Sequence, residues 1–324
     1  MPDANAGRPE PAAPQVKWSV KQLLLVLGVA ATAYAAMLLA WGDSSGASAL
    51  RPSLWAGLQA GALCLVSYGL RGLRWRLWMA HYGRHFGLWQ GLRLYLAGYA
   101  FTPTPGNIGE AVRGLMLAKG PLGARQSLAI FGAERLADLL CLLLLCLPAL
   151  GLAWKLGGTR VLPPWGVGLL AAGAIVALLV AGGLFIFRRI VRQVLLERMG
   201  WLKEAWVCLS VRPLRWFALT LAAWGAQGLA VWLICRDGGL ALGLLAASSS
   251  YAVAMVAGAL SALPAGLGGT EAVLAGLLIA QGAAAGEALG LTVLIRLLTL
   301  WLAVAIGVLA LLYSAAIAKE ISFR

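Results

Sequence analysis

Two short stretches of this sequence place acidic and basic residues within an otherwise apolar chain. The tripeptide Glu-Ala-Val occurs at 110–112 and again at 271–273, and each glutamate is followed 25 residues later by an arginine, Arg135 or Arg296. A guanidinium presents forked donors that match the oxygens of a phosphate. Each glutamate would hold an arginine while the site is empty, or bind a cationic group on a lipid. The pattern therefore predicts a site for a phosphate-bearing molecule.

Further charged residues lie at helical spacing from these. Arg113 is three residues after Glu110 and Asp138 is three after Arg135, so each pair shares a helix face. Because charge within a membrane span is costly, we expect these side chains to face a cavity or one another. We predict substrate binding by Glu110, Arg113, Arg135, Asp138, Glu271 and Arg296, and coupling to an ion by Glu110, Glu134 and Glu271. Two plainer interpretations stay open: the Glu–Arg pairs are structural, or Asp138 caps a broken backbone.

Prolines and glycines break the apolar pattern just before both glutamates. We expect one backbone break at 103–106 and another at 264–269, where the breaking prolines are Pro103, Pro105 and Pro264. The half-helix after each break begins with free amides that favour anions. The residues that would supply these amides are Gly106, Asn107, Gly109, Gly266, Gly268 and Gly269.

The composition of the chain defines the surroundings of these motifs. Of its 324 residues, 61% are hydrophobic and 12% are charged, a ratio that soluble domains do not keep. Apolar runs of about 20 residues can cross a bilayer, and they must be helical because lipid offers the backbone no hydrogen-bond partner. We predict an all-α polytopic membrane protein with six spans, near residues 21–41, 53–70, 126–150, 164–187, 213–235 and 288–315.

The formal net charge of +14 is spread over several regions and does not form one patch. Eight basic residues lie between 71 and 125 and seven between 188 and 215. The positive-inside rule places both regions and both termini on the cytoplasmic side, here of a bacterial-type inner membrane. The charge therefore indicates topology and contact with anionic lipid, and we expect no nucleic-acid partner.

This topology requires two re-entrant hairpins. Basic residues flank the first break on both sides, so the chain there enters and leaves the membrane on one side, and the second hairpin is inverted. Each half reads span, span, hairpin, span, which is the inverted-repeat design of secondary transporters. The predicted domains are a disordered cytoplasmic segment at 1–18, one transmembrane domain at 19–316 with repeats at about 19–150 and 163–316, and a cytoplasmic tail at 317–324.

Four segments carry a resemblance to a known family: LRGLRWRLWM at 70–79, PTPGNIGEAVRGLML at 103–117, ERLADLL at 134–140 and LPAGLGGTEAVL at 263–274. The chain resembles the lysylphosphatidylglycerol synthase transmembrane family, often called flippase-like, over roughly residues 20–316. The resemblance implies a membrane domain that moves lipids with polar headgroups between leaflets. In the best-known members a soluble aminoacyltransferase domain follows. Here the sequence stops at Arg324, so we expect a stand-alone member whose cargo the family does not fix.

The predicted function is therefore that of a flippase or scramblase for a phospholipid or a polyprenyl-phosphate-linked lipid. No lysine precedes a serine or threonine, so there is no phosphate loop, and no Asp-x-Asp pair is present; we predict no catalytic residue. We expect no cofactor, and no metal because His81 and His85 lack a third ligand. The alternatives are a membrane-embedded enzyme or enzyme subunit acting on a lipid-linked sugar or phospholipid, with Glu110 or Glu271 as base, and a structural partner of a lipid-synthesis enzyme. The number of subunits stays open.

Overall fold

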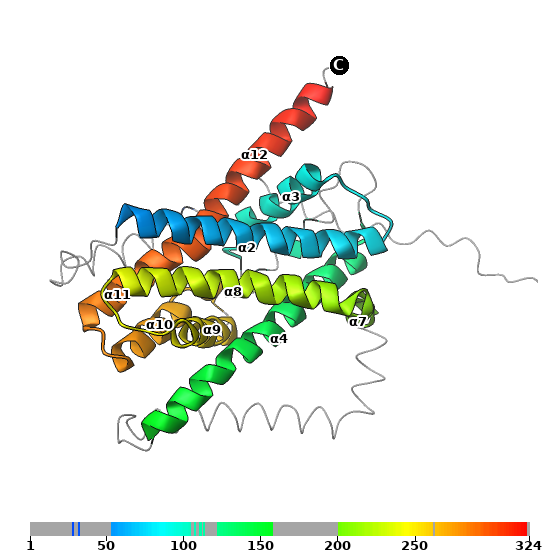
Figure 1. The fold of residues 1–324 in the computed structure, drawn as a ribbon. Coiled ribbons are helices and arrows are strands. Elements are labelled where there is room, and N and C mark those ends of the chain that lie inside the picture. The colour runs from blue at the N-terminus through cyan, green and yellow to red at the C-terminus, as the bar shows by residue number, and fades with distance from the viewer. Residues whose placement is uncertain are drawn as a thin grey trace, which may run out of the picture.

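The computed structural model describes residues 53–104, 122–157, 200–261 and 263–322, with Gly28, Thr32, Asn107, Glu110, Ala111 and Arg113 as further positions. Among these residues all regular structure is helical, as the composition predicts (Figure 1). The predicted segment at 1–18 lies outside the described residues, as does the span near 164–187. Of the span near 21–41, only Gly28 and Thr32 are described, and both are helical.

Two long antiparallel helices pack along one another at the centre of the fold. These are α2 (Leu54–His81) and α8 (Pro213–Asp237) (Figure 1). The hydroxyl of Ser53 accepts the Ala56 amide at 3.2 Å and so caps the start of α2. Asp237, the last residue of α8, accepts the Ser53 amide at 2.5 Å and the Ser53 hydroxyl at 2.9 Å. The end of α8 therefore fixes the beginning of α2.

Loss of this shared cap should measurably destabilise the protein. Ser53→Ala is expected to lower the free energy of unfolding by about 1 kcal/mol, because it removes the acceptor for a helix amide. Asp237→Ala should have a similar effect. The double variant should lose less stability than the sum of the two single losses, because both changes remove the same hydrogen bond between the Ser53 hydroxyl and Asp237. Unfolding in detergent, followed by circular dichroism, measures these values. Additive losses would show that the two residues act independently.

Helix α2 extends beyond the predicted span at 53–70 and ends at His81. Its buried face repeats every three or four residues, at Cys64, Tyr68, Arg71, Trp75 and Trp78. Arg71 and Arg74, which the charge pattern placed in a basic region on the cytoplasmic side, lie in this helix with exposed fractions of 8% and 0%. The apolar run ends near 70, but the helix continues and buries these two charges against other helices.

Among the residues that the structure describes, two helical segments are long and apolar enough to cross a bilayer. Pro213–Asp237 and Ala285–Ser314 confirm the spans predicted near 213–235 and 288–315. The second contains α11 (Ala285–Arg296), the π-helical turn η4 (Leu297–Trp301) and the first part of α12 (Leu302–Ser322). Helix α12 thus continues through most of the tail predicted at 317–324. The region predicted as a span at 126–150 lies in α4 (Ala124–Gly157), which packs against α7 (Gly200–Ser210).

A helical hairpin occupies the second predicted break. It consists of α9 (Leu244–Leu260), the 3-10 turn η3 (Pro264–Gly266) and α10 (Gly269–Ala280). At its open end the Gln281 amide donates to the Ser250 hydroxyl at 2.8 Å. Near its turn a Cβ on Gly258 would collide with the hydroxyl of Thr270, so glycine allows the two helices to approach. These contacts make α9 and α10 antiparallel neighbours.

The first predicted break is held against the last helix. Here α3 (Leu88–Ala97) runs into the 3-10 turn η1 (Gly98–Phe101), and Pro103 follows two residues later. Helix α12 packs on both elements, and a Cβ on Gly307 would collide with the backbone of Tyr99 and Ala100. A glycine in α12 therefore brings the broken backbone of the first half close to a helix of the second half.

Candidate functional site

A cavity of ≈ 370 Å³ lies between the two broken segments. It is lined by residues of α2, η1, α4, α8, α9, η3, α10, α11, η4 and α12. The predicted site residues that line it are Asn107, Glu110, Arg135, Asp138, Gly266 and Arg296. Both halves of the chain contribute to this set. The fold thus brings two motifs that are far apart in the sequence to one polar cavity.

Glu110 is the carboxylate of the first motif, and three side chains donate to it. The Thr102 hydroxyl lies 2.8 Å from Oε1, and Arg113 and Arg135 lie 2.5 Å and 3.4 Å from Oε2. Arg113 also donates to Glu134 at 2.9 Å. Neither Arg113 nor Glu134 lines the cavity. Arg113 therefore positions Glu110 from behind the cavity wall.

Glu271 of the second motif also contacts its predicted arginine, but it lies outside the cavity lining. Arg296 donates through Nε to Glu271 Oε1 at 2.7 Å and through Nη2 to the Ala265 carbonyl at 2.9 Å. The other oxygen of Glu271 accepts the Gly268 amide at 2.7 Å. Glu271 thus joins the start of α10 to the end of α11. The 25-residue spacing predicted both Glu–Arg contacts, and both are present.

The backbone amides expected to be free at the second break are occupied. The Gly266 amide donates to the Leu263 carbonyl at 3.0 Å, and the Gly268 amide donates to Glu271. Gly269 begins α10 close to Ser261. The expectation of free amides is therefore corrected for Gly266 and Gly268, because the hairpin uses them itself. At the first break, Pro105, Gly106 and Gly109 lie outside the described residues, and Asn107 has a positive φ of 56°.

Asp138 joins α4 to two other helices through buried side chains. Its Oδ1 accepts Arg74 Nη1 at 2.6 Å and Trp224 Nε1 at 3.2 Å. Its Oδ2 lies 3.5 Å from Arg135. Arg74 also lies 3.9 Å from Glu134. Among the described residues these contacts are all with side chains, and the cap that the sequence left open stays a prediction.

Arg71 is a cavity residue that the sequence analysis missed. Its Nη2 donates to the Gln227 side chain at 3.1 Å, and its guanidinium lies 4.1 Å from the centre of the Trp224 ring. Among the described residues, no carboxylate forms an ion pair with it. The available signal was its place on α2, three residues after Tyr68 and four before Trp75. Such spacing places a charge on the buried face once the helix is known to continue.

Arg71 and Arg135 are the arginines best placed to bind an anion in this cavity. The side chain of Arg135 is 35% exposed, and its contacts with Glu110 and Asp138 measure 3.4 Å and 3.5 Å. Arg296 is held at 2.7 Å by Glu271, with a side chain only 2% exposed. Arg71 pairs with no carboxylate in the described part of the chain and Arg135 is held loosely, so both can turn donors toward a ligand at small cost.

The cavity opens at an apolar rim. Leu139 of α4, Leu260 of α9 and Leu263 of the hairpin turn line the cavity and are 42%, 81% and 49% exposed. Further leucines of α4 face outward beside them, at 136, 140, 143, 144 and 147. A polar interior with such a rim accommodates a molecule with a charged head and hydrocarbon tails.

These features define an integral membrane protein of helices with a charged internal site. The chain belongs to the family described as the lysylphosphatidylglycerol synthase TM region, whose profile matches residues 23–307. Membership relates the protein to membrane proteins that handle lipids. No match to this chain is found among curated proteins.

Proposed function

We propose that this protein is a flippase or scramblase that moves a phosphate-bearing lipid between the leaflets of a bacterial-type inner membrane. The lipid is a phospholipid or a polyprenyl-phosphate-linked lipid. The observation that carries this proposal is that Arg71, which forms no ion pair with a described carboxylate, shares a leucine-rimmed cavity with the loosely held Arg135. The headgroup enters the cavity and the hydrocarbon chains remain outside the rim.

The contacts of the cavity suggest how a headgroup is held. Phosphate oxygens take the place of Glu110 and Asp138 as partners of Arg135, and they accept donors from Arg71. Gln227 and Trp224 hold the Arg71 side chain while the site is empty. When phosphate oxygens replace carboxylate oxygens, the arginines keep hydrogen-bond acceptors throughout. Binding therefore does not require an unpaired charge exposed to lipid.

The two broken segments supply the elements that move. In our proposal each is a re-entrant hairpin, the two are inverted repeats, and both termini are cytoplasmic. Alternate opening of the two hairpins would expose the cavity to one leaflet at a time. Glu110 is the carboxylate placed for ion coupling, because it lines the cavity. Glu134 and Glu271 are enclosed in ion pairs away from it.

The position of the glutamates supports transport over a general-base role. Glu271 does not line the cavity, and Glu110 accepts hydrogen bonds from three side chains. A general base needs a free oxygen within hydrogen-bond reach of its substrate.

Transport of fluorescent phosphatidylglycerol in proteoliposomes tests the proposal. Arg71→Gln and Arg135→Gln should each slow translocation at least about tenfold, since a hydrogen bond to a charged group contributes about 1.5–3 kcal/mol. Arg236→Gln removes an exposed arginine at the far end of α8, beside Trp232, and serves as the matched control. Equal rates for wild type, Arg71→Gln and Arg135→Gln would contradict the proposed headgroup site.

A further inference from the structure

A second cavity, of ≈ 520 Å³, lies between α2 and α8 and shares no lining residue with the central one. Its basic residues are Arg76, Arg84, His85 and Arg215. Its apolar residues include Leu73, Leu77, Phe86 and Leu219. No carboxylate is among its described lining residues. The groove therefore combines a basic end with an apolar wall.

Several contacts make the groove a built feature. Arg76 Nη2 donates to the Phe86 carbonyl at 2.6 Å and so holds the segment after α2 against that helix. The Phe86 ring stacks on Trp75 with centroids 5.8 Å apart and planes 9° apart. Arg84 Nε is buried and has no hydrogen-bond partner among the residues that the structure describes. A buried donor without an acceptor is costly, so this groove offers binding energy to an anionic ligand.

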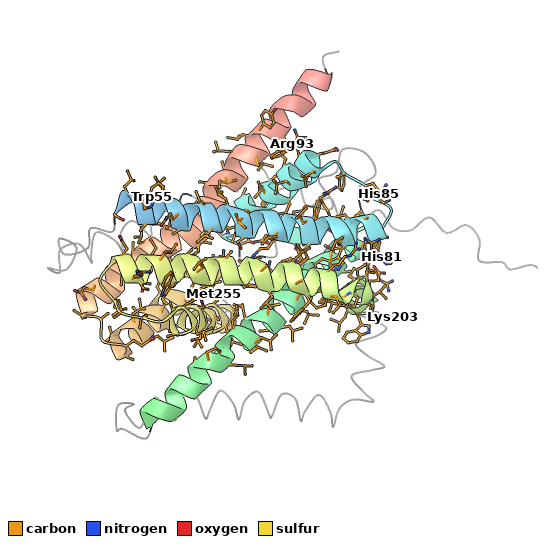
Figure 2. The ribbon with its side chains drawn as sticks, viewed as in Figure 1. Trp55, His81, His85, Arg93, Lys203 and Met255 are labelled. Carbon is orange, nitrogen blue, oxygen red and sulfur yellow. The ribbon has the colours of Figure 1, made fainter. Side chains whose placement is uncertain are left out.

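The position of the groove along α2 indicates which ligand is available. Figure 2 shows His81, His85 and Lys203 at one end of the helical bundle and Trp55 at the other. Near the basic end, the large apolar side chains of Leu88, Trp89 and Leu214 are exposed. Basic and aromatic residues at one level are typical of a membrane interface, and the positive-inside rule makes it the cytoplasmic one. Anionic phospholipids are concentrated there.

We propose that this groove binds one anionic phospholipid of the cytoplasmic leaflet. Its phosphate lies among Arg84, His85 and Arg215, and one acyl chain follows Leu77 and Leu219. The site is separate from the transport cavity, and the proposal does not depend on transport. A bound lipid would join α2 to α8 at the end opposite the Ser53–Asp237 contact, and so stabilise the central helix pair at both ends.

Native mass spectrometry of the full-length protein, titrated with phosphatidylglycerol in detergent, tests this site. All proteins carry Arg71→Gln, which weakens the central cavity equally in each, so a difference in affinity between the proteins below reports the groove. Adding Arg84→Gln and Arg215→Gln should weaken that binding about 25-fold, because each arginine at an anionic surface contributes about fivefold. The matched control adds Arg93→Gln and Arg236→Gln, which remove the same charge outside the groove.

A second variant tests the groove without changing its charge. Ala218→Phe fills the apolar part and should also reduce binding of phosphatidylglycerol, while unfolding temperatures confirm that each variant is folded. Phosphatidylcholine with the same acyl chains should bind weakly to every protein. Equal affinity of the groove variant and its matched control would overturn the proposal, as would equal binding of phosphatidylcholine and phosphatidylglycerol to the starting protein. Transport through the central cavity is measured separately, so failure of one proposal leaves the other standing.

Discussion

Asp138→Ala is expected to lower the free energy of unfolding by about 3–5 kcal/mol, because it leaves a buried arginine without its bonded carboxylate. Arg74 is fully buried and lies 2.6 Å from Asp138, whereas its other carboxylate, Glu134, is 3.9 Å away. The change also removes the acceptor for Trp224. Denaturation in mixed micelles, followed by circular dichroism, gives the free energy. A loss of less than about 1 kcal/mol would show that Asp138 does not hold the buried network together.

Two control variants show whether the loss of stability comes from the charge of Asp138 and from the burial of its ion pair. Asp138→Asn keeps the shape but removes the charge, so it should destabilise nearly as much if the ion pair is the cause. Glu204→Gln breaks the contact with Arg125 at 2.8 Å, where the arginine side chain is 61% exposed. Exposed pairs contribute about 0–1 kcal/mol, so this variant should unfold close to wild type.

Arg296→Met is expected to lower the free energy of unfolding by about 3 kcal/mol or more, because it leaves the carboxylate of Glu271 buried and unpaired. Adding Glu271→Gln should restore most of this stability. The glutamine is neutral, and its side-chain oxygen still accepts the Gly268 amide. Thermal and micelle denaturation of the single and double variants measure the recovery. No recovery in the double variant would mean that the stability resides in the contact of Arg296 with Ala265.

The same double variant separates two interpretations of the second Glu–Arg pair. If the pair is structural, the folded double variant still transports lipid. If Arg296 contacts the cargo, the double variant is folded but transports slowly. The assay with fluorescent phosphatidylglycerol decides between them.

The sequence predicted the two Glu–Arg contacts because equal spacing after equal tripeptides is visible without any structure. Arg135 lies 3.4 Å from Glu110, and Arg296 lies 2.7 Å from Glu271. The hydrogen bond of the Gly268 amide could also have been predicted, since a glutamate three residues after a helix start is the acidic half of a capping box. The sequence-based prediction assigned that amide to an external anion instead.

The role of α2 was not predictable from local pattern. Its apolar run ends near residue 70, and its partners Gln227 and Asp138 come from α8 and α4. Only the packing of α2 along α8 shows that Arg71 meets Gln227 and not solvent. The leucine rim depends likewise on how α4 lies beside the second hairpin, because a leucine-rich helix looks the same whether it faces lipid or protein.

Recognition of the phosphate is tested with two fluorescent lipids, one of which lacks a phosphate. Translocation of phosphatidylglycerol and of a neutral diacylglycerol-linked sugar is measured in matched vesicles, for wild type and for Arg71→Gln. Wild type should move phosphatidylglycerol faster than the neutral lipid, and Arg71→Gln should lose that preference. Equal rates for the two lipids in wild type, or an unchanged preference in Arg71→Gln, would contradict recognition of a phosphate at Arg71.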